Sequence, residues 1–307
     1  MGLFSRKKAG EDEPVAEPDD FDPIDNIALL AMIRFRVRGL EVDVAEDSAG
    51  LDSALVDSSG TNRYALRGLI EQMLPLSPDS DEYHATLLQS VDSMIDMITA
   101  PSIASFTDDE LAASVRIRLL PDSFPPARQE YAQRVAPGLV TVLCIDHPTS
   151  IAYINDSELA GRDVHALFDA GFRNVMAEPI DQVEELVPGI HLLSGESLFI
   201  ATKAIGLGSL LGTVLPPAPL GVIVGMPHRH AMFVHVLTGP ESIDVLGRLA
   251  SAVAASAAEQ PEPARVSGSI YYWKDHVFEQ AGGLGEDGSI HIWPSERLTA
   301  VLRPAGA

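Results

Sequence analysis

The pattern of apolar positions in the first half of the chain predicts helices and short strands in alternation. Its clearest element is a helix over residues 79–98, which begins at a capping Asp79 or Ser80 and keeps apolar side chains at helical spacing. Pro101 ends this pattern. The other elements predicted here are a helix over 27–33, a strand over 35–44, a helix over 64–73, a helical turn from Thr107 and a strand over 115–119.

Strand pairs interleaved with helices are predicted for the second half. The most informative segment is residues 221–237, in which two apolar stretches rich in β-branched residues flank the polar turn 227–230. Helices are predicted over 129–134, 163–176, 197–211 and 242–257, and strands over 139–145, 151–154, 190–193, 269–273, 277–280, 289–292 and 298–302. The expected fold class is therefore α+β, with a mixed, largely antiparallel sheet and packed helices.

The proline-punctuated residues 121–126 give the best internal boundary. We predict a disordered acidic tail over residues 1–25, where apolar residues are few. An N-terminal α+β domain is expected over 26–122 and a C-terminal α+β domain over 123–307. Arg116 and Arg118 lie at period two on the strand before this boundary, and we expect them on a solvated face of the sheet.

Charge narrows the range of partners. The 307-residue chain has a formal net charge of −23, which repels phosphate backbones and argues against nucleic acid as a partner. A protein partner, which this charge allows to be basic, fits better. The single cysteine, Cys144, lies in an apolar segment, so it is expected to be buried, and it excludes an internal disulfide. The expected location is the cytoplasm.

The sequence contains no stretch that reaches the about 20 apolar residues of a membrane span. No transmembrane segment and no secretory signal are therefore expected. Leu3, Phe4, Arg6, Lys7 and Lys8 offer a weak contact with an anionic membrane surface. A disordered tail without this role is the simpler interpretation.

Three of the nine histidines, His228, His230 and His235, fall within eight residues, a pattern typical of the start of a metal site or an acid–base site. On a hairpin, His228, Arg229 and His230 are expected at an exposed turn, whereas His235 lies well down the second strand, at about 3.3 Å per residue. A zinc ion needs nitrogen ligands about 2.0–2.1 Å away, so a local three-histidine site is not expected. A metal held by His228 and His230 would need carboxylates from elsewhere.

Other candidate motifs are weaker. Asp146 and His147 end an apolar strand, where α/β enzymes display catalytic groups, but with Pro148 they also form an ordinary turn. The glycine run 206–212 lacks the spacing of the dinucleotide fingerprint. Residues 194–197 lack the spacing of a nucleophile elbow. The sequence therefore predicts no bound cofactor.

Several segments of the second half follow one another in a recognisable order. They are SFP at 123–125, the strand pair LVTVLCID and SIAYIN, a helix that ends near Arg173 and Asn174, the segment GIHLLSGESLFIATKAI, and the apolar strand that runs into Pro227 and His228. This order resembles the YtpQ-like proteins, a bacterial family of unknown function, over about residues 115–280. His230 stands where that family has an acidic residue. The resemblance implies a related fold and no particular reaction.

The sequence contains no complete catalytic constellation, and its acidic tail is suited to reaching a partner. Both observations favour a non-catalytic, cytosolic binding or scaffold protein whose partner is another protein. His228, Arg229 and His230 are the candidate contact surface, with Asp146 and His147 as weaker candidates. The alternative is a metal-dependent hydrolase or other enzyme in which His228 and His230 act with distant carboxylates.

Overall fold

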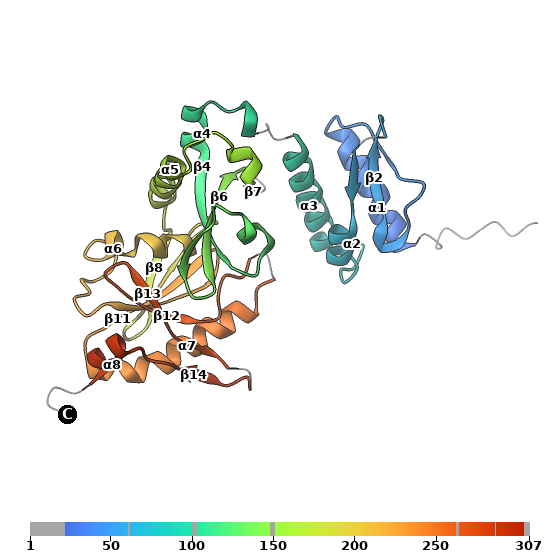
Figure 1. Ribbon diagram of the computed structural model, residues 1–307. Coiled ribbons are helices and arrows are strands. Elements are labelled where there is room, and N and C mark those ends of the chain that lie inside the picture. Colours follow the sequence, from blue (N-terminus) through green and yellow to red (C-terminus); the bar gives the residue numbers. More distant parts are fainter. Residues whose placement is uncertain are drawn as a thin grey trace, which may run out of the picture. The chain divides into compact units, whose positions relative to one another are not determined.

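The α+β fold class is confirmed in a computed structural model of the chain (Figure 1). The structure describes residues 22–60, 62–99, 103–147, 151–261, 264–285 and 287–303. These ranges contain eight α-helices and fourteen strands in three antiparallel sheets. The predicted tail over 1–25, including Leu3, Phe4, Arg6, Lys7 and Lys8, lies outside the described residues up to position 21. Its last residues were predicted wrongly, because Pro23, Ile24 and Asp25 already belong to the first helix. Two compact units make up the chain, Met1–Ala100 and Pro101–Ala307.

Unit 1 packs three helices against a small antiparallel sheet with the strand order β1-β2-β3. Its elements are α1 (Pro23–Val37), β1 (Val42–Val44), the 3-10 helix η1 (Gly50–Asp52), β2 (Ala54–Asp57), β3 (Arg63–Ala65), α2 (Arg67–Met73) and α3 (Asp81–Thr99). Asp22 begins α1, because its side chain accepts a hydrogen bond of 2.9 Å from the amide of Ile24. Helix α3 matches the helix predicted over 79–98.

The first helix is longer than the sequence pattern indicated. Phe35 and Val37, predicted on a strand, lie in the last turn of α1. Arg34 and Arg38, one helical turn apart, both pair with Asp92 of α3, at 2.6 and 2.8 Å, and this contact favours helix to the end. The helix predicted over 64–73 was wrong at its start, because Tyr64 belongs to β3.

Unit 2 is built around a seven-stranded sheet with the order β14-β13-β12-β10-β11-β9-β8. Its strands are β8 (Gln182–Val187), β9 (Ile190–Ser194), β10 (Val222–His228), β11 (Ala231–Val236), β12 (Ile270–Lys274), β13 (Val277–Leu284) and β14 (Ile290–Ile292). Helix α7 (Ile243–Ala258) covers one face and the 3-10 helix η5 (Ala201–Gly206) the other (Figure 1). Gly225 lets α7 approach, because a Cβ there would lie 2.2 Å from Val253 Cγ2.

A second sheet in unit 2 has the order β4-β6-β5, with β7 also paired to β6. Its strands are β4 (Val115–Pro121), β5 (Gln133–Ala136), β6 (Leu139–Asp146) and β7 (Ile151–Tyr153). Strands β4 and β6 pair along the whole of β4. The proline-rich segment 121–126 therefore connects two strands of one sheet inside unit 2, although the sequence marked it as a boundary between 26–122 and 123–307.

Helices and 3-10 helices complete unit 2. They are η2 (Ile103–Ser105), α4 (Asp108–Ser114), η3 (Pro125–Arg128), η4 (Asp156–Leu159), α5 (Val164–Ala177), α6 (Leu207–Leu210), η6 (Pro240–Ser242) and α8 (Glu296–Leu302). The strand predicted over 298–302 was wrong, because Ser295 caps α8 by accepting from the amide of Leu298 at 3.2 Å. The helix predicted over 197–211 is replaced by η5 and α6, and β8 was not predicted.

Candidate functional site

The turn of the predicted hairpin lies between β10 and β11, where His228 pairs with Ala231 across Arg229 and His230. Three other segments of unit 2 hold its main chain. The amide of Arg229 donates to the carbonyl of Ala264 at 3.1 Å, and the carbonyl of Arg229 accepts from the amide of Ala201 at 3.2 Å. The carbonyl of His230 accepts from the amide of Gly195 at 3.3 Å. The turn is therefore half-buried and fixed, where the sequence predicted an exposed tip.

Hydrogen bonds define the protonation of the two histidines in the turn. His230 Nδ1 lies 3.2 Å from the carbonyl oxygen of Gly195, which only accepts, so Nδ1 carries the proton. His230 Nε2 then accepts from Arg229 Nε at 2.9 Å. His228 Nδ1 accepts from the amide of His230 at 3.3 Å, which leaves Nε2 of His228 as a donor.

Burial lowers the pKa of both histidines, and neighbouring positive charge lowers it further. For His228 the pKa falls because of burial, then His230 and Arg229. For His230 burial comes first and Arg229 second. Both rings are accordingly neutral at neutral pH, so the positive charge of the turn comes from Arg229.

The turn does not have the geometry of a metal site. Both ring nitrogens of His230 are already engaged, so a metal would have to displace Arg229 or Gly195. His235 pairs with Ile223, five positions along the strand from His228, and its Nδ1 donates to the carbonyl of Gly189 at 2.5 Å. In the described ranges no group of three or more His, Cys, Asp and Glu residues could hold a metal ion.

The weaker candidates Asp146 and His147 lie at the end of β6 in the second sheet. Among the residues that the structure describes, no hydrogen bond or ion pair joins either of them to the hairpin turn. The rest of β6 is buried, as the sequence predicted. Burial raises the pKa of the Cys144 thiol on this strand to about 12, so the thiol stays protonated. The structure therefore shows no bonded contact between Asp146 or His147 and the described turn residues 228–230.

Arg118 is the residue near the turn that sequence reasoning placed wrongly. It was expected on a solvated face, but it is only 4% exposed. Its guanidinium carbon lies 5.8 Å from the ring centroid of Tyr153 on β7, in the geometry of a cation–π contact. Burial lowers the pKa of Arg229, and the nearby charge of Arg118 lowers it further. Tyr153 interacts electrostatically with both arginines. Arg118 and Tyr153 are therefore in contact, and both interact electrostatically with Arg229.

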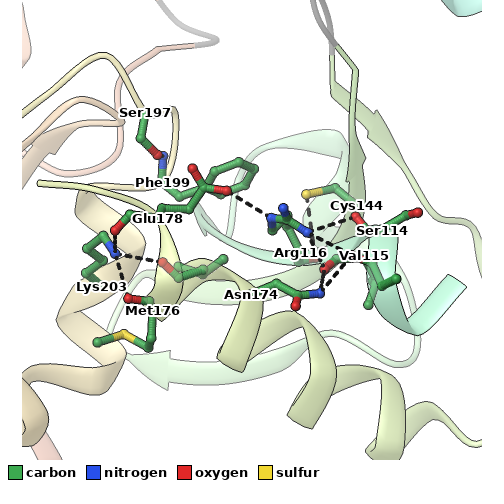
Figure 2. A network of polar contacts seen from close by, with 12 residues as sticks. Ser114, Val115, Arg116, Cys144, Asn174, Met176, Glu178, Ser197, Phe199 and Lys203 are labelled. Carbon is green, nitrogen blue, oxygen red and sulfur yellow. Dashed lines mark hydrogen bonds and ion pairs between the residues drawn. The ribbon is translucent and has the colours of Figure 1, made fainter. Parts of the chain in front are cut away.

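Arg116, two positions earlier on β4, belongs to a different set of contacts, shown in Figure 2. Its Nε donates to Glu178 Oε1 at 3.0 Å, and its Nη1 donates to the carbonyls of Ser114 and Val115 at 3.2 Å. Asn174 of α5 donates to the carbonyl of Val115 at 2.8 Å. These bonds join the end of α4 to α5.

Lys203 is a second buried cation that the sequence did not single out. It lies in η5 and is 1% exposed. Its Nζ donates to the carbonyls of Val175, Met176 and Glu178 at 2.7, 3.3 and 2.7 Å, and so caps the end of α5 (Figure 2). Burial lowers its pKa, while the charge of Glu178 opposes that change. The role of Lys203 is therefore to stabilise the fold at the end of α5.

A surface pocket of about 410 Å³ lies beside the glycine run 206–212. Its lining consists of Phe172, Arg173, Met176, Ile205, Gly206, Gly208, Ser209 and His276. The run forms the end of η5 and the start of α6 instead of a turn between a strand and a helix. This geometry differs from the dinucleotide fingerprint, in agreement with the spacing of the glycines.

No family model, no curated protein and no solved structure matches this chain. None of the helices in the described ranges combines the length and the apolar character that a membrane crossing requires.

Proposed function

We propose that this protein is a non-catalytic binding protein that recognises another protein through the hairpin turn His228, Arg229 and His230. The observation that carries the proposal is the main chain of this turn, which Ala264, Ala201 and Gly195 hold by hydrogen bonds. A recognition site whose side chains are already positioned loses little conformational freedom on binding. The turn meets that requirement.

The polar atoms of the turn support recognition by hydrogen bonds. His228 keeps its Nε2 donor, and the terminal amino groups of Arg229 form no hydrogen bond with the described residues. His230, whose two nitrogens are engaged, instead orients the guanidinium of Arg229. Donors that are fixed and partly exposed are typical of binding sites that read a polar group of a partner.

The proposal also includes the cellular location of the protein and its relationship to a known family. The acidity of the chain and its single cysteine favour the cytoplasm. We keep the relationship of residues 115–280 to the YtpQ-like family as a proposal too. Its test is whether a YtpQ-like protein of known structure has the strand order β14-β13-β12-β10-β11-β9-β8.

Partner capture tests the proposed function. The full chain, tagged at its C-terminus in its native cell, is crosslinked, purified and quantified by mass spectrometry. We expect one partner at near-stoichiometric yield, and we expect His228→Ala to reduce this yield by about tenfold or more, as loss of a central hydrogen bond does. A variant that lacks residues 1–21, and so keeps the cap Asp22 of α1, asks separately whether the tail contributes.

His165→Ala is the matched control, because His165 is an exposed histidine of α5 in the same unit. It should leave the yield of the partner unchanged. Absence of a stoichiometric partner from the wild-type protein would contradict the proposal. Equal losses for His228→Ala and His165→Ala would contradict the assignment of the turn.

A further inference from the structure

We infer that Arg118, Arg229 and Tyr153 together form a binding site for an oxyanion, a phosphate or carboxylate group of the ligand. The inference rests on the proposed function and names the chemistry that the hairpin turn recognises. Three different elements supply the site: Arg118 comes from β4, Tyr153 from β7 and Arg229 from the turn after β10. All three belong to unit 2.

Arg118 forms no ion pair with the described residues. A guanidinium does not lose its proton in a protein, and burial of an unpaired charge is costly. Yet among the described residues the 4% exposed Arg118 side chain contacts the ring of Tyr153 and forms no hydrogen bond and no ion pair. The carboxylate of Asp146 interacts with it electrostatically, but not at ion-pair distance. A buried guanidinium without an ion-pair partner is expected to bind an anion.

The nitrogens of Arg118 remain accessible to a ligand. Among the described residues, the side-chain N and O atoms that are sealed from solvent and lack a partner are His235 Nε2 and Trp273 Nε1. The Arg118 nitrogens are not among these atoms and have no partner, so they keep contact with solvent. Arg229 and Tyr153 are half-buried. None of the three side chains is therefore fully sealed from solvent, as binding of an anion requires.

Arg229 adds a second positive charge at the same place. Its Nε is fixed on His230 at 2.9 Å, which leaves its terminal amino groups for a ligand. Two guanidinium groups near each other repel, most strongly where water is excluded. The hydroxyl of Tyr153, near both arginines, also forms no hydrogen bond with the described residues. One oxyanion would satisfy all three groups.

A shortage of acidic residues does not explain the unpaired arginines. The chain has 44 Asp and Glu residues against 21 Lys and Arg residues. On the same strand, Arg116 has Glu178 at 3.0 Å. Arg118, only two positions away, has no partner at this distance, and the exposed Asp146 interacts with it electrostatically without forming an ion pair. The local excess of positive charge is therefore a specific feature of this site.

The overall charge of −23 restricts the size of the anion. Charges beyond about 8 Å are largely screened at physiological ionic strength, so a single phosphate or carboxylate group feels mainly the two arginines. A long polyanion would also meet the acidic surface. The site accordingly fits one anionic group, such as that on a side chain of a protein partner, and does not fit a nucleic acid.

Titration calorimetry on the purified full chain tests the site directly. The probes are inorganic phosphate and acetate, each added at constant ionic strength with chloride as the balancing anion. We expect saturable binding of one equivalent of at least one probe. Phosphate binding without acetate binding identifies a phosphate site, and the reverse identifies a carboxylate site.

Three variants check which residues bind the probe. Arg229→Gln should weaken binding about tenfold or more, because a charge-assisted bond and a full charge are lost. Tyr153→Phe, which removes only the hydroxyl, should weaken binding several-fold. Arg173→Gln removes an exposed arginine of α5 and should leave binding unchanged. These sites avoid the buried Arg118, whose replacement would also change the core.

Two results would overturn the inference: no saturable binding of either probe by the wild-type protein, or equal affinities for wild type and Arg229→Gln. The outcome is separable from that of partner capture. If His228→Ala loses the partner but the purified protein binds neither probe, the oxyanion site is wrong and the proposed function stands. If a probe binds as expected but no partner is captured, the proposed function fails and the anion site remains.

Discussion

His235 couples the stability of unit 2 to pH. This side chain is 4% exposed, and burial lowers its pKa from the usual 6.5, although the hydrogen bond to Gly189 opposes the change. At pH values between the lowered pKa and 6.5, the unfolded chain takes up a proton that the folded chain does not, so the free energy of unfolding falls as pH falls through 6.5. We expect urea unfolding to show lower stability at pH 5 than at pH 7.

His235→Gln should reduce this loss, because glutamine keeps a donor for Gly189 and does not titrate. Part of the slope should remain, since burial also lowers the pKa of His228 and His230. His165→Gln, at an exposed position, is the control and should change nothing. If His235→Gln loses as much stability between pH 7 and pH 5 as wild type, the coupling is wrong.

Lys203 stabilises the C-terminal end of α5 through hydrogen bonds to its last carbonyl groups. Lys203→Met keeps the apolar stem but leaves the carbonyls of Val175, Met176 and Glu178 without their donor. We expect a decrease of about 2–4 kcal/mol in the free energy of unfolding, measured with urea at pH 7. Lys274→Met on β12, where no hydrogen bond of the side chain is lost, should cost much less. Equal effects of the two variants would contradict the capping role.

The sequence revealed some residue environments and hid others. The burial of Cys144 was predictable, because apolar residues surround it on its own strand. Arg118 was not, since an arginine at period two has the same sequence pattern whether the far side of the sheet is open or covered. Arg118 contacts Tyr153 and interacts electrostatically with Arg229, both of them far from it in the sequence. The polar turn 228–230 could be predicted from the sequence. The interaction of its Arg229 with Arg118 of β4 could not.

Close packing between α5 and β4 depends on one glycine. A Cβ at Gly171 would lie 3.0 Å from the backbone atoms Arg116 C and Ile117 N, which cannot move aside as a flexible side chain does. Gly171→Ala should therefore reduce the free energy of unfolding by about 1–3 kcal/mol. Thermal or urea unfolding measures the effect.

Gly247 of α7 is the matched control, because the same added methyl group meets nothing within 4 Å. Gly247→Ala should raise the free energy of unfolding by about 0.5–1 kcal/mol, through the lower backbone entropy of alanine in the unfolded chain. Opposite signs for the two variants are the expected outcome. A stabilising Gly171→Ala would show that β4 and α5 can separate without cost.

Local patterns were enough to predict elements whose ends are fixed locally. Helix α4 begins at Thr107, whose hydroxyl accepts from the amide of Glu110 while Glu110 reaches back, and both residues are in the sequence window that predicted it. The end of α1 could not be predicted in this way, because Asp92, which pairs with Arg34, lies 58 positions away in the sequence. Helix α8 was missed although its cap is local: Ser295, followed by Glu296, is a helix-start signal that the sequence contains.

Each unit contains its own hydrophobic core. The buried cluster of unit 1 uses residues up to Ile95, and the clusters of unit 2 use residues from Ile103 onward. Residues 101–307 expressed alone should therefore fold, with the same thermal midpoint as the corresponding transition of the full chain. Differential scanning calorimetry checks this expectation.

A fragment cut at the boundary that the sequence indicated serves as the comparison. Residues 123–307 lack β4, which pairs with β6 along its whole length and carries Ile117 and Leu119 into the core. This fragment should not give a cooperative transition. If it unfolds as cooperatively as residues 101–307, the smaller sheet does not need β4. Prolines mark turns in a sequence, but they do not distinguish a turn inside a sheet from a linker.

Strand β8 forms one edge of the seven-stranded sheet, and all six of its residues are exposed. A free edge presents unpaired N–H and C=O groups that invite the same strand of another molecule. Glu184 and Glu185 occupy the middle of this strand. Antiparallel pairing of two copies about that middle would place Glu184 of each copy opposite Glu185 of the other, one pair of carboxylates on each face of the sheet, which is unfavourable. While these glutamates are ionised, the acidity of the chain thus protects its most accessible strand against aggregation.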